Sequence, residues 1–310
     1  KREFNSITPE NIMKAEVIHP EANKYDFNLS DKFVAYGQKN NMYVVGHTLI
    51  WHSQLPAFVN KISTADSLRM FMKEHINTVA GRYSGKLNSW DVVNEALNED
   101  GTLRESLFYK LLGENYLKEA FDLAAEADPQ AALYYNDYNI EQPAKRKGAI
   151  ALIKKLQASG TKIDGVGIQG HWSINDNNLK EVEDAIVEFS ALGIKVAFTE
   201  LDYTVLPNPW DLEGAEVNQN FEGNPAMNMY TESLPDSVQT QLAKRYEDLF
   251  RLFLKHKDKI SRVTFWGVND GHSWLNGWPI KNRTNYPLFF DRAYQPKKAY
   301  DAVLSLKSTN

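Results

Sequence analysis

Short apolar runs rich in β-branched and aromatic residues alternate along the chain with longer amphipathic segments. Runs of this kind, bounded by turn residues, are typical of buried strands. We expect seven of them, at residues 4–7, 43–49, 89–93, 132–135, 165–169, 195–199 and 262–266. Between them apolar residues recur at helical spacing, as in the set Leu68, Met72, Ile76 and Val79. That spacing predicts amphipathic helices.

The alternation of strands and helices predicts an α/β fold in which βα units wind into a (β/α)8 TIM barrel. Such a barrel has eight strands, whereas seven are expected here and the first already starts at residue 4. We therefore expect the first βα unit of the barrel to be missing from this chain. No internal repeat, low-complexity tract or flexible linker divides the sequence. This favours a single barrel domain over residues 1–310, incomplete at its N-terminus.

The composition excludes several classes of function. The 310 residues include 35 Lys and Arg against 40 Asp and Glu, a net charge of -5, and no basic stripe runs along any segment. A nucleic-acid partner is therefore not expected. The absence of cysteine excludes disulfides, a thiol nucleophile and Cys-based zinc sites. No apolar run approaches the roughly 18 residues of a membrane-spanning helix, and the given chain starts without a signal peptide.

Polar residues collect where the predicted strands end, which in a βα barrel is the face that carries the chemistry. Two of them are glutamates, Glu95 after the run 89–93 and Glu200 after the run 195–199. Hydrolysis of an acetal requires two carboxyl groups, one protonated to donate to the leaving oxygen and one ionised to attack or to activate water. Repulsion between close carboxylates raises the pKa of one and keeps it protonated. The alternative is that Glu95 caps a helix and Glu200 is a solvated loop residue.

Histidines at strand ends offer a second reading, a barrel hydrolase with a catalytic metal. Neither the spacing from His47 to His52 nor the sequence around His171 forms a His-x-His or His-Glu-x-x-His motif. We therefore expect no metal and no other cofactor, and loss of activity on chelation is the test that would favour the metal. Three further histidines are expected on the surface or on helices: His19, His75 and His256.

Tryptophan is frequent, with seven residues in the chain. Several fall at or after strand ends: Trp51, Trp172, Trp266, Trp274 and Trp278. An indole combines a large apolar face with a polar edge, which suits the apolar faces and hydroxyl rims of sugar rings. Trp90 instead lies inside an apolar strand and is expected in the core. The distribution of the others favours a carbohydrate substrate.

With these residues in place, the chain closely resembles glycoside hydrolase family 10, the retaining endo-β-1,4-xylanases. Two of the matching segments carry the glutamates, Trp90-Asp91-Val92-Val93-Asn94-Glu95-Ala96 and Thr199-Glu200-Leu201-Asp202. The others lie at residues 6–14, 46–52, 135–139 and 167–171 and around Trp266 and Trp274, so the match spans nearly the whole chain in order. The resemblance implies a catalytic barrel that cleaves internal xylosidic bonds of xylan or xylo-oligosaccharides.

By this resemblance Glu95 is the acid/base and Glu200 the nucleophile of a double displacement, which places their carboxyl groups about 5–5.5 Å apart. Asn94 matches the residue that holds the 2-hydroxyl of the sugar at the cleaved bond. His171 is implied to contact Glu200 and to be oriented by Asp202. The remaining matches line the glycone subsites, with Tyr138 on the leaving-group side: Glu10, Asn11, Lys14, His47, Trp51, Gln169, Trp266 and Trp274.

The sequence departs from the family pattern at three places. Ile12 and Ala15 replace an acidic residue and a tryptophan beside Met13-Lys14, the irregular stretch at 207–235 predicts a longer loop, and the first βα unit is missing. In some members a carbohydrate-binding module is inserted near that unit, so an inserted or upstream module of the same polypeptide is an expected partner. We expect a secreted, periplasmic or cell-surface location. A reading from another class is a truncated barrel that binds xylan without cleaving it.

Overall fold

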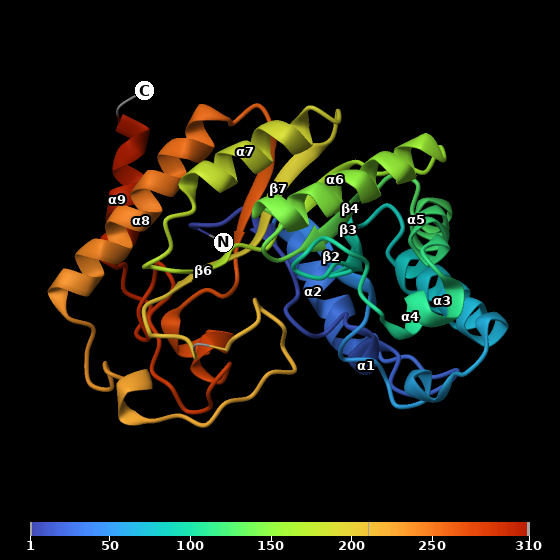
Figure 1. Ribbon diagram of the computed structural model, residues 1–310, viewed down its shortest axis with the longest axis horizontal. Coiled ribbons are helices and arrows are strands. Elements are labelled where there is room, and N and C mark those ends of the chain that lie inside the picture. Colours follow the sequence, from blue (N-terminus) through green and yellow to red (C-terminus); the bar gives the residue numbers. More distant parts are fainter. Residues whose placement is uncertain (1, 210, 309–310) are drawn as a thin grey trace. The chain divides into compact units, whose positions relative to one another are not determined.

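A computed structural model describes residues 2–209 and 211–308 (Figure 1). Most strands that neighbour each other in its sheet also follow one another in the chain. The strands are β1 (Ser6–Ile7), β2 (Tyr43–Trp51), β3 (Ser89–Asn94), β4 (Ala132–Asp137), β5 (Gly165–Ile168), β6 (His171–Ser173), β7 (Lys195–Thr204) and β8 (Ile260–Phe265). Their order is β1-β2-β3-β4-β5-β7-β6, and β8 pairs with β7. All seven predicted strands are therefore confirmed.

Helices separate most of these strands. They are α1 (Ala15–Ile18), α2 (Asn28–Lys39), α3 (Ala65–Arg82), α4 (Leu107–Leu112), α5 (Asn115–Ala127), α6 (Pro143–Ala158), α7 (Leu179–Ser190), α8 (Asp236–Lys255) and α9 (Lys298–Ser305). Short 3-10 helices lie at Val59–Lys61, Pro225–Met227, Asp270–His272, Trp274–Asn276 and Leu306–Ser308. Figure 1 shows α3, α4 and α5 packed together and α8 beside α9. The predicted βα alternation is therefore present.

The chain divides into two compact units, and the division cuts through β5, α7 and β7. The first unit comprises Lys1–Gly167 and Glu188–Ala197, and the second comprises Ile168–Val187 and Phe198–Asn310. Strands β1 to β4 belong to the first unit, whereas β6 and β8 belong to the second. This division does not test the expectation of a single catalytic domain over residues 1–310, which stays a prediction.

The core of the first unit shows why these segments form strands and helices. The predicted inner face of α3 is fully buried: Leu68, Met72, Ile76 and Val79. Trp90 on β3 is also fully buried, as its apolar surroundings in the sequence predict. A Cβ atom at Gly46 on β2 would meet the Trp90 ring at 2.1 Å. Only glycine leaves room for this ring against the neighbouring strand.

Several strands run further than predicted. Strand β7 continues to Thr204, so Glu200 and Asp202 lie within it and not after it. The Glu200 amide donates to the Gln169 carbonyl over 2.9 Å, and the Asp202 amide donates to the Gly170 carbonyl over 3.2 Å. The hydrophobic pattern ends where polar side chains begin, whereas strand pairing depends on main-chain groups and continues through them.

The sequence pattern does not predict β6, because three residues are too few to show a period. It follows β5 just after Gly170, whose φ is 81°, and pairs in parallel with β7, with His171 opposite Asp202. No helix separates β5 from β6, and both strands pair with β7. Strand β6 therefore adds no βα unit. The expectation that the first βα unit is missing stays a prediction.

His19 does not lie on the surface or on a helix, so that expectation is wrong for it. It directly follows α1, it is 1% exposed, and its Nδ1 atom lies 3.2 Å from Nδ1 of the fully buried His75 on α3. The His19 ring also stacks on Tyr25, with centroids 4.0 Å apart. His256 follows α8 and is buried as well, so the expectation is also wrong for this residue. The Nδ1 contact and the ring stacking join segments that are distant in sequence, so local sequence does not reveal the burial of His19.

The stretch at 207–235 connects β7 to α8, and its described residues contain only the short helix Pro225–Met227. The expected extended loop is thus confirmed, apart from Trp210, which lies outside the described residues. Within the parts of the chain that the structure describes, no helix is both long and apolar enough to cross a membrane.

Candidate active site

Glu95 follows β3 directly and lies in a polar cluster of the first unit, where it is 3% exposed. Trp51 Nε1 donates to its Oε2 atom over 2.7 Å, and Asn94 Nδ2 donates to its Oε1 atom over 3.1 Å. Asn136 Nδ2 donates in turn to Asn94 Oδ1 over 2.8 Å. We call these four residues the Glu95 cluster. Neutral donors therefore orient both carboxyl oxygens.

Strand register brings the Glu95 cluster together. Trp51 and Asn94 are Cα partners between β2 and β3, and Asn94 and Asn136 are partners between β3 and β4. Residues that are distant in sequence therefore meet at one edge of the sheet, the edge where barrels carry their chemistry. The reading of Glu95 as a helix cap is wrong, because the next helix begins at Leu107 and Ser106 caps it.

Lys14 lies beside Trp51 of this cluster. Its Nζ atom donates to Asn11 Oδ1 and to Gln54 Oε1, each over 2.9 Å, and lies 4.8 Å from the Trp51 ring centroid. Lys14 is buried, whereas Asn11 and the neighbouring Glu10 are exposed. The structure thus joins two predicted binding residues, Lys14 and Trp51, and gives Lys14 a partner, Gln54, that the sequence did not reveal.

His47 is buried on β2 beside Asp91 on β3. The two residues are Cα partners, and His47 Nδ1 lies 3.0 Å from Asp91 Oδ2. A carboxylate that binds one ring nitrogen fixes the orientation of an imidazole and leaves the other nitrogen to act elsewhere. Asp91 therefore positions a predicted binding residue.

Glu200 lies in a second polar cluster, which belongs to the second unit. His171 Nε2 lies 3.2 Å from Glu200 Oε2, and His171 Nδ1 lies 3.0 Å from Asp202 Oδ1. Trp274 Nε1 donates to the other oxygen of Asp202 over 2.8 Å. We call these four residues the Glu200 cluster. Glu200 is 5% exposed, so its reading as a solvated loop carboxylate is wrong.

The charges of the Glu200 cluster favour a protonated imidazole. Burial alone would lower the pKa of His171, but the nearby Asp202 and Glu200 carboxylates outweigh it and raise that pKa to about 10. His171 is therefore an imidazolium at neutral pH, held between two carboxylates. A fixed positive charge at this distance stabilises the ionised form of Glu200.

Aromatic rings surround His171. Its ring centroid lies 4.8 Å from Trp274 and 6.4 Å from Trp266, and Trp274 stacks on Trp278 with centroids 4.4 Å apart. Trp172 instead is buried, with its ring centroid 5.7 Å from that of Tyr203, so it is a core residue. Gln169 is 1% exposed and contributes the main-chain carbonyl that pairs with Glu200.

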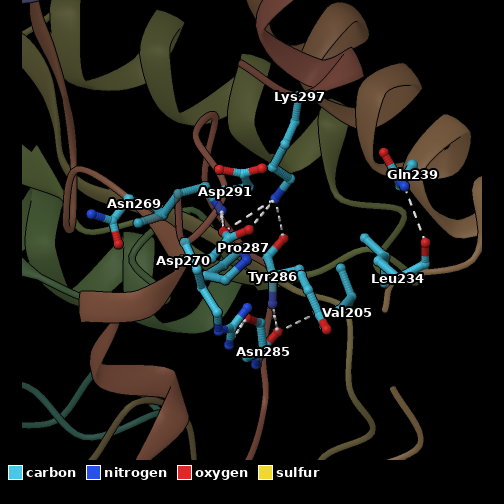
Figure 2. A network of polar contacts seen from close by, with 12 residues as sticks. Val205, Leu234, Gln239, Asn269, Asp270, Asn285, Tyr286, Pro287, Asp291 and Lys297 are labelled. Carbon is cyan, nitrogen blue, oxygen red and sulfur yellow. Dashed lines mark hydrogen bonds and ion pairs between the residues drawn. The ribbon is translucent and has the colours of Figure 1, made fainter. Parts of the chain in front are cut away.

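A buried polar network fixes the segment around Trp274. Figure 2 shows the Lys297 ammonium directed at Asp270 and at the Tyr286 carbonyl, to which it donates over 2.9 Å and 2.8 Å. Asn285 Oδ1 accepts from the Val205 amide at the end of β7 over 3.1 Å. These bonds tie the loop that carries Trp274 to the strand that carries Glu200.

The structure places Tyr138 in the first unit and holds it by residues that the sequence pattern does not single out. Arg104 Nη2 donates to the Tyr138 hydroxyl oxygen over 2.8 Å, and the Lys145 ammonium lies 3.5 Å from the ring centroid. Burial, and then the charge of Glu95, raise the pKa of Tyr138. The hydroxyl therefore keeps its proton.

The predicted residues thus fall into two groups. The Glu95 cluster belongs to the first unit and the Glu200 cluster to the second. The separation of about 5–5.5 Å expected between the two carboxyl groups stays a prediction, as does the absence of a metal.

Comparison with known proteins identifies relatives along the whole chain. The sequence profile of Glycosyl hydrolase family 10 matches residues 1–306. Endo-1,4-beta-xylanase A of Xylanibacter ruminicola is 44% identical over 308 residues, which cover 98% of this chain and 84% of the relative. Beta-1,4-xylanase of Dictyoglomus thermophilum is 43% identical over 302 residues, which cover 97% and 81%.

Solved structures give the same result. A GH10 endoxylanase retrieved from a sugarcane soil metagenome is similar with a TM-score of 0.95 and 47% identity, over 98% of this chain and 90% of that chain. A mutant structure in complex with xylotriose is similar with a TM-score of 0.87 and 37% identity, over 97% and 89%. The predicted fold class, a (β/α)8 TIM barrel, is confirmed by these matches together with the strand order.

Proposed function

The chain belongs to glycosyl hydrolase family 10 and is thus a glycoside hydrolase, and from this membership we propose that it is a retaining endo-β-1,4-xylanase. The relatives support the substrate, since those that match over most of their length are named xylanases. The observation that carries the mechanism is the contrast between the two glutamates. An imidazolium binds Glu200, whereas Trp51 and Asn94, both neutral, bind Glu95.

In this mechanism Glu200 is the nucleophile. The His171 imidazolium keeps its carboxylate ionised, and Asp202 holds the imidazole in place. The Glu200 oxygen attacks the anomeric carbon as the bond to the leaving oxygen breaks, which forms a covalent glycosyl-enzyme. Water then attacks the same carbon from the face that the leaving group vacated, so two inversions give net retention.

Glu95 transfers the proton in both steps. As the acid it donates to the leaving oxygen, and as the base it takes a proton from the attacking water. Repulsion by the Glu200 carboxylate keeps Glu95 protonated before the first step, and esterification of Glu200 removes that repulsion. The mechanism requires the two carboxyl groups about 5–5.5 Å apart.

Binding roles follow the same assignment. Asn94 holds the 2-hydroxyl of the sugar at the cleaved bond, and Tyr138 lies on the leaving-group side. The glycone subsites are lined by Glu10, Asn11, Lys14, His47, Trp51, Gln169, Trp266 and Trp274, and His171 is a further substrate-binding residue. Xylan or xylo-oligosaccharides are the expected partners, with a carbohydrate-binding module of the same polypeptide and a location outside the cytoplasm as further parts of the proposal.

Two substitutions test the roles. Glu200→Ala should abolish turnover of every substrate, because no glycosyl-enzyme can form. Glu95→Ala should abolish turnover of xylan but spare the first step with 2,4-dinitrophenyl xylobioside, whose leaving group needs no proton. Glu119→Ala, which removes a half-buried carboxylate paired with Arg69, is the control and should keep wild-type rates.

The products separate this proposal from its alternatives. Release of reducing ends from soluble xylan, with the β-anomer seen first by NMR, supports retaining hydrolysis. Tight binding of xylan without new reducing ends would instead favour the non-cleaving binder. Loss of activity after treatment with a chelator would favour the metal-dependent hydrolase.

A further inference from the structure

Glu95 has a main-chain conformation that residues other than glycine rarely adopt. Its φ is 57°, in the left-handed region, which a residue other than glycine keeps only where the surrounding structure holds it there. The turn follows the last residue of β3 and sets the direction of the carboxyl group. Something must therefore fix this peptide for the carboxyl group to keep its place.

Main-chain groups on both sides of Glu95 are bound. Its amide donates to the Asn136 carbonyl over 2.9 Å, and the following amide, that of Ala96, donates to the Tyr135 hydroxyl over 3.2 Å. The Glu95 carbonyl accepts from Arg104 Nε over 3.1 Å. The Arg104 amide donates in addition to the Ala96 carbonyl over 2.8 Å. Arg104 thus contacts the two peptides that follow the strained residue.

A short hairpin delivers the guanidinium of Arg104. Leu97 and Leu103 form an antiparallel bridge, and between them the Asn98 amide donates to the Thr102 carbonyl over 2.8 Å. Asp100 accepts from the Thr102 amide at the tip over 2.9 Å. The hairpin returns the chain to Ala96, so the main chain of Arg104 is held in place while its side chain binds the Glu95 carbonyl.

The same guanidinium also holds Tyr138. Arg104 Nη2 donates to the hydroxyl oxygen over 2.8 Å, while Nε binds Glu95. Lys145, paired with the fully buried Asp137 over 3.0 Å, covers the ring. Because the Tyr138 hydroxyl keeps its own proton, its hydrogen remains to be donated to a substrate oxygen. The planar Arg104 guanidinium therefore connects Glu95, the proposed acid, to Tyr138 on the proposed leaving-group side.

We propose that Arg104 is a positioning residue for proton donation: it fixes the strained Glu95 peptide and the Tyr138 hydroxyl in one arrangement, so that the acid points at the leaving oxygen. The proposal rests on the role of Glu95 proposed above. Arg104 acts through Glu95 and Tyr138 and not through contact with the reacting atoms. Its loss should therefore slow reactions in proportion to their need for a proton.

The test is a series of aryl xylobiosides with leaving groups of graded basicity. In Arg104→Met, kcat/KM for phenyl xylobioside should fall by about 10²-fold, whereas that for 2,4-dinitrophenyl xylobioside should change by less than about threefold, because misplaced acids lose the general-acid contribution only. The dependence of log kcat/KM on leaving-group pKa should steepen accordingly. Arg69→Met is the matched control, since Arg69 pairs with Glu119 at the surface, and it should keep the wild-type slope.

Two further variants make the result decisive. Arg104→Lys keeps the charge but lacks the planar fork, so it should show the same steepening, and it replaces Arg104→Met in the comparison if the latter does not fold. Tyr138→Phe leaves the bond from Arg104 to Glu95 in place and should change KM for xylo-oligosaccharides more than the slope.

The outcomes separate this proposal from the proposed function. A flat response of Glu95→Ala across the series would refute the acid role itself. If Glu95→Ala gives a steep dependence on leaving-group pKa, the Arg104 variants decide the second proposal. An unchanged slope in those variants, or an equal loss on all substrates, would refute only the role of Arg104. A steeper slope in both sets supports the two assignments together.

Discussion

The imidazolium between Glu200 and Asp202 makes Asp202→Asn the most informative single change. Asparagine has nearly the same shape and keeps an acceptor for Trp274 or His171, but it carries no charge. His171 Nδ1 lies 3.0 Å from Asp202 Oδ1, and unit charges at that distance attract by about 5–6 kcal/mol at an effective dielectric constant of 20. Each 1.4 kcal/mol corresponds to about one pKa unit.

Removal of that attraction should lower the pKa of His171 from about 10 to near neutrality. The imidazole would then be neutral above that pH, and Glu200 would lose the charge that keeps it ionised. We expect kcat/KM of Asp202→Asn to fall by about 10²-fold at pH 8, with its basic limb displaced to lower pH. The sign for stability follows: a raised pKa of the folded state stabilises the fold below pH 6.5, and this contribution is lost as the pH rises towards 10.

The assay is an NMR titration of the His171 ring beside pH profiles of kcat/KM on an aryl xylobioside. Asp248→Asn, which removes a carboxylate paired with the exposed Lys244, controls for a general change in charge. A His171 pKa that stays near 10 in Asp202→Asn would refute the reasoning, because Asp202 would then not be the source of the raised value.

Three more predictions concern the rest of the fold. Burial lowers the pKa of His19 to about 4 and that of His75 to about 3, so the unfolded state binds protons before the folded state does. The unfolding free energy, measured with urea, should therefore fall by about 3 kcal/mol or more as the pH drops from 6.5 to 4. The fall should be smaller in His19→Phe. Gly46→Ala places a Cβ 2.1 Å from the Trp90 ring and should cost about 1–3 kcal/mol or more, read from the same transition at pH 7. Lys297→Met leaves a buried carboxylate unpaired and should cost about 3–5 kcal/mol, and an unchanged melting temperature would contradict this.

The sequence predicts the strands and both glutamates because these follow from local pattern. Glu95 ends an apolar run, and the run predicts β3 from its own residues alone. The resemblance to a known family supplied the contact of His171 with Glu200 and Asp202, which the distances confirm.

Apart from the contacts that the resemblance implies, contacts between distant segments could not be predicted. Arg104 and Gln54 lie in irregular segments, where no period reveals the direction of a side chain. His19 and His75 are 56 residues apart, and nothing in either local sequence indicates a shared hydrogen bond. The bounds of β7 were predicted too short because its polar residues interrupt the pattern but not the main-chain ladder.

Each cluster includes an indole whose N–H points at a carboxylate: Trp51 at Glu95 and Trp274 at Asp202. An indole proton resonates apart from most amide protons, and its frequency changes when its acceptor gains or loses charge. The indole signal of Trp51 therefore reports the charge of Glu95 and that of Trp274 the charge of Asp202, without a label at the carboxylates and without a bound sugar. The proposed proton donor and the carboxylate that orients His171 can thus be titrated separately in the resting protein.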